Sequence, residues 1–251
     1  MPNATTIHDV IDDLDAIIEH CIENNSRAGL FAYIYRRTTY EIASEISLGN
    51  FEDNELLEEF DVLFARLYLD AYEAYKNQQE VSASWAYAFD QAEKPLTIVQ
   101  HILLGMNAHI NLDLAVAAAR VMKGRNILEI ENDFNKVNVI LFRITNELQD
   151  RLSRVSPLMF TLDLMGMNKD EKIINFSMRK ARQHSWKAAR RLWSLEGKET
   201  DRAIQRIDRT VLVLSKLIRS PKSLTMWLFL LLIRKFETHE TGVVISRLRE
   251  D

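Results

Sequence analysis

Glycine and proline are scarce in this chain, with 7 and 4 among its 251 residues. Sandwiches and barrels need a turn about every ten residues, and turns consume Gly, Pro, Asn and Asp. Long helices need few such residues, so the scarcity indicates an all-α fold. Apolar residues make up 47% of the chain, enough to bury a sizeable core. We expect more than about 60% helix, against an average near one-third.

Helical periodicity, with its start and stop signals, divides the chain into about nine helices. The sequence shows no internal repeat and no linker, so we expect one domain spanning residues 1–251. The longest apolar segment follows Pro95, runs from about Leu96 to Met122 and ends at Gly124. Its apolar residues lie in nearly every direction around the helix axis, which is typical of a buried helix. Residues 96–122 are therefore the expected central helix.

The most apolar run, Leu224 to Ile233, spans roughly 15 Å as a helix, about half of a bilayer core. We expect a buried helix here and no stable membrane insertion. Cys21 is the only cysteine, which excludes an internal disulfide, and the first residues show no signal-peptide pattern. These features predict a cytoplasmic protein.

Charge is distributed unevenly along the chain. Residues 1–61 carry 14 Asp or Glu against 3 Lys or Arg, whereas residues 169–222 carry 15 Lys or Arg against 6 Asp or Glu. A basic half can indicate nucleic-acid binding, but no nucleic-acid motif accompanies it. We interpret the imbalance as acidic N-terminal helices packing near basic C-terminal ones, and expect no nucleic-acid partner.

Polar residues interrupt the apolar central helix between Gln100 and Leu114. At about 100° per residue, four residues spaced four apart form one stripe: the polar residues His101, His109 and Asp113, with Gly105 between them. Asn107 lies on the flank of this stripe. Polar groups on a buried helix must be hydrogen-bonded, paired or bound to a ligand. Gly105 leaves space beside the stripe for a metal, a water or a substrate group.

His109 and Asp113 have the i, i+4 spacing of helical metal sites and could share one divalent metal as the cofactor. A third ligand would come from Asp61, Asp70 or Asp133, and we place Asp70 in the predicted set. For Asp133, capping a helix is the alternative role. For both histidines, the alternative is a structural hydrogen bond to a carboxylate on a neighbouring helix.

A second polar face lies between residues 175 and 193. Asn175, Arg179 and Arg182 share this face with Trp186, at spacings of four, three and four. An inward arginine needs an anionic partner, which is either a carboxylate of this chain or the carboxylate or phosphate of a substrate. We therefore place Asn175, Arg179 and Arg182 with Asn107 as candidate substrate-binding residues.

Three segments resemble a bacterial family without assigned function, the domain of unknown function 5995. They are QHILLGMNAHINLDLAVA (100–117), RLYLDAY (66–72) and NFSMRKARQHSW (175–186). The resemblance extends from about Arg27 to Leu248 and is most specific in the first segment. It implies motif positions at His101, Asn107, His109, Asp113, Asp70, Asn175, Arg179 and Arg182. It implies no activity, substrate or cofactor.

Three functions remain open from the sequence. The first is a metal-assisted hydrolase or lyase acting on an anionic small molecule, with His101, His109 and Asp113 as catalytic residues. The second is a metal-free binding protein for an apolar ligand with an acidic head group. The third is a scaffold protein whose polar network is structural. A homo-oligomer is compatible with each of them.

Overall fold

The computed structural model describes residues 4–156 and 170–250. These residues form eleven α-helices and no strand, and helix makes up 80% of the structure. The predicted all-α fold is confirmed, with eleven helices rather than about nine. The helices are α1 (Ile7–Glu23), α2 (Ala28–Ser47), α3 (Asn54–Lys76), α4 (Ala83–Asp90), α5 (Ile98–Ala108), α6 (Leu114–Val121), α7 (Glu131–Val155), α9 (Asp170–Trp193), α10 (Gly197–Arg219), α11 (Leu224–Phe236) and α12 (Thr241–Arg249). A π-helical turn (His109–Asp113) and a 3-10 turn (Ile127–Ile130) complete the list.

Polar side chains fix the starts of several helices. At the start of α1, Thr6 accepts a hydrogen bond from the backbone N–H of Asp9, whose carboxylate accepts one from the backbone of Thr6. Thr97 and Gln100 form the same reciprocal pair at the start of α5. Such capping satisfies N–H groups that the first helical turn leaves without a partner. It also fixes the residue at which the central helix begins.

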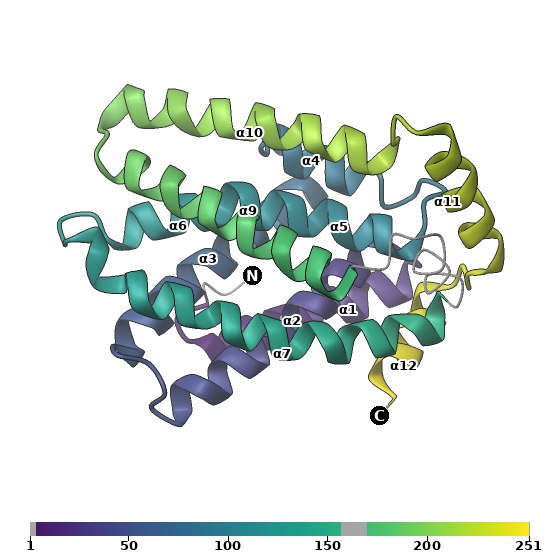
Figure 1. Cartoon of the computed structure of the whole chain (residues 1–251), viewed down its shortest axis with the longest axis horizontal. Coiled ribbons are helices and arrows are strands. Elements are labelled where there is room, and N and C mark those ends of the chain that lie inside the picture. Colours follow the sequence, from purple (N-terminus) through teal and green to yellow (C-terminus); the bar gives the residue numbers. More distant parts are fainter. Residues whose placement is uncertain (1–3, 157–169, 251) are drawn as a thin grey trace.

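Helices α5 and α6, joined by the π turn, form one continuous helix through the middle of the molecule (Figure 1). Helices α2 and α10 pack against α5, while α3 and α9 pack against α6. Leu104 and Leu114 are each 1% exposed, so the predicted central helix is confirmed. By length and composition, Ile98–Val121 is the one described helix that could cross a membrane, and 78% of its most apolar window is buried inside the molecule.

Helix α11 differs from the sequence prediction. The run from Leu224 to Ile233 was expected to be buried, but Ile233 is the buried residue of α11 and most of its other large apolar side chains are exposed. These exposed side chains are Leu224, Trp227, Leu228, Leu231, Leu232 and Phe236. The helix lies at one end of the molecule, beyond the end of α10 (Figure 1). The prediction was wrong because an apolar composition does not show whether another element covers the helix.

Candidate functional site

The polar segment of the central helix coincides with its π turn, from His109 to Asp113. A π turn is rare, and it is frequent at functional sites. The backbone N–H of Leu114 donates to the carbonyl of His109, five residues earlier. The buried hydroxyl of Ser185 on α9 donates a hydrogen bond to the carbonyl of Ile110 inside the turn. In a regular α-helix this carbonyl would instead accept a hydrogen bond from a backbone N–H of the same helix.

The π turn places His109 and Asp113 in direct contact. Nδ1 of His109 lies 3.0 Å from Oδ2 of Asp113, and the indole Nε1 of Trp85 donates to the same oxygen at 2.9 Å. Indole N–H can only donate, and a carboxylate oxygen can accept two hydrogen bonds. We therefore assign the His109 proton to Nδ1, which leaves Nε2 as an acceptor. The result is a series of two hydrogen bonds that links Trp85 to Asp113 and Asp113 to His109.

Aromatic rings enclose the imidazole of His109. The ring of Phe64 stacks on it with 3.7 Å between centroids and 9° between planes, and the ring of Tyr35 meets it edge-on at 4.3 Å. Phe31, Tyr68 and Trp85 lie further out in the same enclosure. His109 is 2% exposed and Asp113 is 4% exposed. Burial lowers the pKa of His109, which favours the neutral ring; burial also raises the pKa of Asp113, while the hydrogen bonds from His109 and Trp85 act in the opposite direction and favour its carboxylate form.

Several buried polar atoms of this core have no hydrogen-bond partner among the described residues. They include Nε2 of His109, Oδ2 of Asp61 and the hydroxyl of Tyr68. Leaving such a group without a partner costs about 1–3 kcal/mol. A core that served stability alone would gain by replacing these groups with apolar ones. Two of them, Nε2 of His109 and the hydroxyl of Tyr68, belong to rings that contact each other, which makes this part of the core a candidate site.

Arg182 is the predicted arginine that reaches the core, where it is 4% exposed. Its guanidinium donates to Oδ1 of Asn138 at 2.7 Å and to the carbonyl of Phe134 at 2.6 Å, and lies 4.4 Å from the centre of the Phe134 ring. Burial lowers its pKa to about 10, while the charge of Asp61 opposes the shift. The hydrogen-bond partners of Arg182 are therefore an amide and a backbone carbonyl of this chain, and the Asp61 carboxyl acts on it through its charge alone. Arg179 is exposed, and the side chain of Asn175 lies outside the described residues.

Asp61 makes the stability of the protein depend on pH. Burial raises its pKa from the ordinary 3.8 to about 7, although Arg182 acts in the opposite direction. Between about pH 4 and pH 7 the folded protein holds a proton that the unfolded chain has released, so stability falls as pH rises through this window. The total loss is about 4 kcal/mol.

Replacing Asp61 by asparagine is expected to remove this loss. The variant should gain stability relative to wild type as pH rises from 5 to 8, and the gain should level off above about pH 7. Urea unfolding at each pH measures the difference. A constant difference across this range would contradict the raised pKa of Asp61.

His101 lies apart from His109, at a small pocket of about 20 Å³ between α2, α4 and α5. Its Nε2 has no hydrogen-bond partner among the described residues, and burial lowers its pKa to about 3. Phe31 and Trp85 line this pocket and also lie near His109. The space beside Gly105 is filled, because a Cβ atom there would lie 2.4 Å from the Phe31 ring. The expected vacancy at Gly105 is therefore occupied by an aromatic side chain.

Asn107 is bound within the protein rather than free for a substrate. Its Nδ2 donates to the carbonyl of Val211 at 3.0 Å and to Oγ of Ser215 at 2.9 Å, both on α10. Its Oδ1 accepts a hydrogen bond from Asn111 at 3.0 Å. Both donor hydrogens of the amide are used, so the structure assigns Asn107 to the attachment of α10.

The predicted metal ligands do not come together in the described residues. Asp70 is exposed, whereas His109 and Asp113 are buried. The carboxylate of Asp133 accepts the backbone N–H groups of Glu52 and Asp53, each at 2.9 Å, and so holds the loop before α3. No group of three or more His, Cys, Asp or Glu side chains within residues 4–156 and 170–250 could hold a metal ion. What the structure retains of the predicted set is the pair His109 and Asp113.

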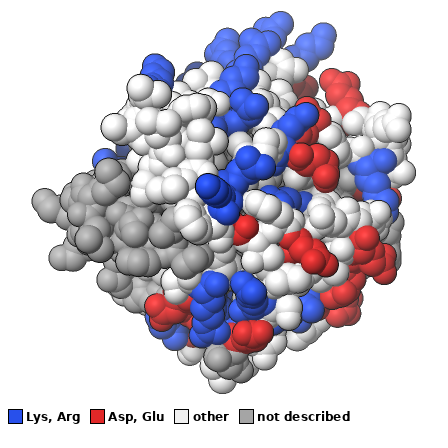
Figure 2. Space-filling view, turned by 90° about the vertical axis from the view of Figure 1, so that its right-hand side faces the viewer, with Lys and Arg blue, Asp and Glu red and all other residues white. Residues whose placement is uncertain are grey.

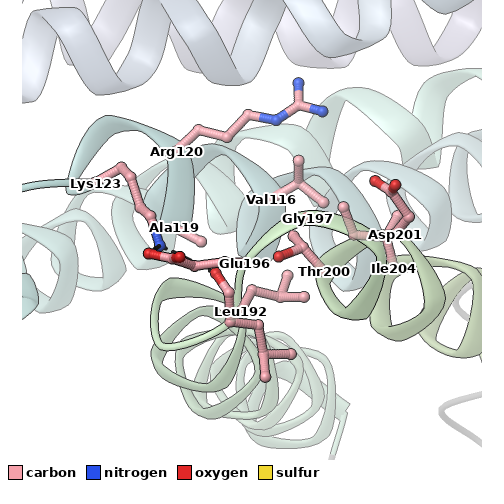
Figure 3. Close-up of a pocket in the computed structure, with 11 residues that line it drawn as sticks. Val116, Ala119, Arg120, Lys123, Leu192, Glu196, Gly197, Thr200, Asp201 and Ile204 are labelled. Carbon is pink, nitrogen blue, oxygen red and sulfur yellow. Dashed lines mark hydrogen bonds and ion pairs between the residues drawn. The ribbon is translucent and has the colours of Figure 1, made fainter.

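A second site was not visible in the sequence. A groove of about 500 Å³ lies where the end of α6 faces the corner between α9 and α10 (Figure 3). Arg120 and Lys123 come from one side, and Glu196 on the other side lies 3.8 Å from Nζ of Lys123. The apolar lining residues are Val116, Ala119, Leu192, Leu195 and Ile204. Because these residues come from three helices, no local spacing pattern connects them.

The comparisons with known proteins yield one family and no relative. The model of a family of unknown function (DUF5995) matches residues 7–221. No curated protein matches the chain significantly, and no solved structure does.

Proposed function

The chain belongs to the DUF5995 family of unknown function, and we propose that it is a hydrolase in which His109 acts as the general base on a small, largely apolar substrate. The observation that carries the proposal is the chain Trp85–Asp113–His109, which leaves a buried Nε2 without a partner among the described residues. A base oriented by a carboxylate is the arrangement that activates a water or a hydroxyl nucleophile.

Each member of the chain has a definite role. His109 accepts a proton at Nε2 from a water whose oxygen bonds to the acyl carbon of the substrate, and Asp113 stabilises the imidazolium that forms. As the acyl–oxygen bond breaks, the imidazolium returns this proton to the leaving oxygen. Trp85 is a positioning residue, because its N–H fixes the Asp113 oxygen that faces Nδ1. The lowered pKa keeps His109 neutral, which is the form a general base requires.

The surroundings of His109 define the substrate. Five aromatic rings lie around it, and the nearest buried arginine, Arg182, is committed to Asn138 and Phe134. These features favour an apolar group over the anionic one expected from the sequence. The pocket at His101 is the proposed entrance, since Phe31 and Trp85 line it and movement of their rings would connect it to His109.

Turnover of chromogenic esters tests the proposal. We expect the purified protein to hydrolyse p-nitrophenyl acetate or butyrate, and His109→Gln to lower kcat/KM by about 100-fold or more. His184→Gln is the matched control, because His184 is exposed on α9. Equal turnover by His109→Gln and wild type, or no turnover by wild type above the buffer rate, would contradict the hydrolase.

The groove at α6 favours a second candidate function, the binding of an apolar ligand with an acidic head group. Its volume of about 500 Å³ is within the range of ligand sites, roughly 300–1,000 Å³. Apolar residues form its walls, and Arg120 and Lys123 provide positive charge at one side. Glu196 is paired with Lys123, so Arg120 is the cation proposed to bind the head group.

Octanoate is a suitable probe for this groove. In ¹⁵N-resolved NMR spectra, octanoate should shift the backbone amides of Gly197 and Thr200, which line the groove. Arg120→Glu should abolish these shifts, and Arg209→Glu, an exposed position further along α10, should preserve them. Shifts that persist in Arg120→Glu would contradict binding of the head group by Arg120.

A further inference from the structure

We propose that α11 docks the protein on an anionic lipid surface, with its exposed apolar side chains in the bilayer interface. Soluble proteins rarely expose a contiguous apolar patch without a function. In α11, six large apolar side chains are between 42% and 69% exposed, on a helix of 13 residues. Trp227 and Leu231 lie one helical turn apart on this face.

Helix α11 begins at a side-chain cap and is tied to the rest of the protein at its other end. Ser223 caps the first turn by accepting the N–H of Met226. At the other end, the buried carboxylate of Glu237 accepts the backbone N–H of Ile98 at 2.9 Å and the hydroxyl of Ser156 at 2.6 Å. Because Glu237 ties the end of α11 to the start of α5, the helix presents its apolar face as part of the folded surface.

The charges around α11 select the partner. From the last turn of α10 to the end of α11, residues 216–236 contain five Lys or Arg and no Asp or Glu, in a chain with a net charge of −4. Lys222 and Lys235 flank the two ends of the helix and are exposed. Figure 2 looks onto this end of the molecule, where uncharged surface is bordered by Lys and Arg side chains. Apolar side chains flanked by basic ones fit the interface of a membrane with anionic lipids.

The length of α11 determines how it would lie. Thirteen residues span about 20 Å as a helix, less than the roughly 30 Å of a bilayer core. The helix would therefore lie in the plane of the interface and would not cross the membrane. A second copy of this chain is a weaker partner, because pairing two α11 surfaces would bring their basic flanks together.

Co-sedimentation with lipid vesicles tests this docking. We expect the protein to bind vesicles of phosphatidylcholine and phosphatidylglycerol (3:1) at least about tenfold more tightly than pure phosphatidylcholine, and to be released as salt is raised. The fluorescence of exposed Trp227 should shift to shorter wavelength on binding. Trp227→Glu/Leu231→Glu should weaken binding by more than tenfold.

The control variant is Val139→Glu/Phe142→Glu, which places the same charges at exposed apolar positions of α7. Circular dichroism and melting temperature should show that both variants fold, since all four positions are exposed. The proposal is overturned if the protein does not sediment with the mixed vesicles, if it binds both vesicle types equally, or if the two variants bind alike. It is also overturned if ultracentrifugation shows a dimer that Trp227→Glu/Leu231→Glu dissociates, without vesicle binding by the wild type.

Discussion

Replacing Leu104 by aspartate is expected to unfold most of the protein. Leu104 is 1% exposed in the middle of α5, so a carboxylate at this position would be buried. An uncompensated buried charge costs about 3–5 kcal/mol, a large part of the stability of a typical domain. Circular dichroism and urea unfolding measure the loss.

The neighbouring residue supplies the control. Leu103 precedes Leu104 in the same helix and is 41% exposed, so Leu103→Asp should change stability by less than about 1 kcal/mol. The two variants have the same composition and differ only in the face that receives the charge. Equal melting temperatures for Leu103→Asp and Leu104→Asp would show that α5 is not the central helix.

Replacing Asp113 alone by leucine should also be strongly destabilising. The change leaves the N–H of Trp85 and the Nδ1–H of His109 buried without an acceptor. At about 1–3 kcal/mol for each of the two groups, the free energy of unfolding should fall by about 2–6 kcal/mol. Denaturant unfolding of the variant measures this loss.

The double variant His109→Phe/Asp113→Leu separates function from stability. It removes the polar pair, leaves only the N–H of Trp85 without its acceptor, and adds an aromatic ring to an aromatic enclosure. Replacing a buried polar pair by apolar residues is often neutral or stabilising. We therefore expect the double variant to lie within about 2 kcal/mol of wild type, with ester turnover lost. A double variant as unstable as Asp113→Leu would indicate that the pair is structural.

The pair of His109 and Asp113 was predictable from the sequence because both residues lie in one helix, four positions apart. Periodicity is also informative for α3, where Asp61 and Asp70 are nine residues apart. At 100° per residue they lie on opposite faces, and Asp61 is the one that shares a face with the apolar residues Ala65 and Tyr68. The structure buries Asp61 and exposes Asp70, so the choice of Asp70 as a metal ligand could have been avoided.

Other features depend on contacts between distant segments and leave no local pattern. Trp85 lies on α4, 28 residues from Asp113, and nothing in its surroundings indicates the hydrogen bond between them. Phe64 stacks on His109 only through the packing of α3 against the central helix. Gly105 has no side chain, so the sequence indicated free space beside it. Which ring fills that space depends on where α2 packs.

The protonation of His109 tests the central claim most directly. Nitrogen-15 NMR of the labelled imidazole distinguishes Nδ1–H from Nε2–H and neutral from charged rings. We predict a neutral His109 at pH 7 with its proton on Nδ1 and an unprotonated Nε2, because burial lowers its pKa and Asp113 faces Nδ1. A proton on Nε2 in the neutral ring, or an imidazolium at pH 7, would contradict the assignment of His109 as a general base.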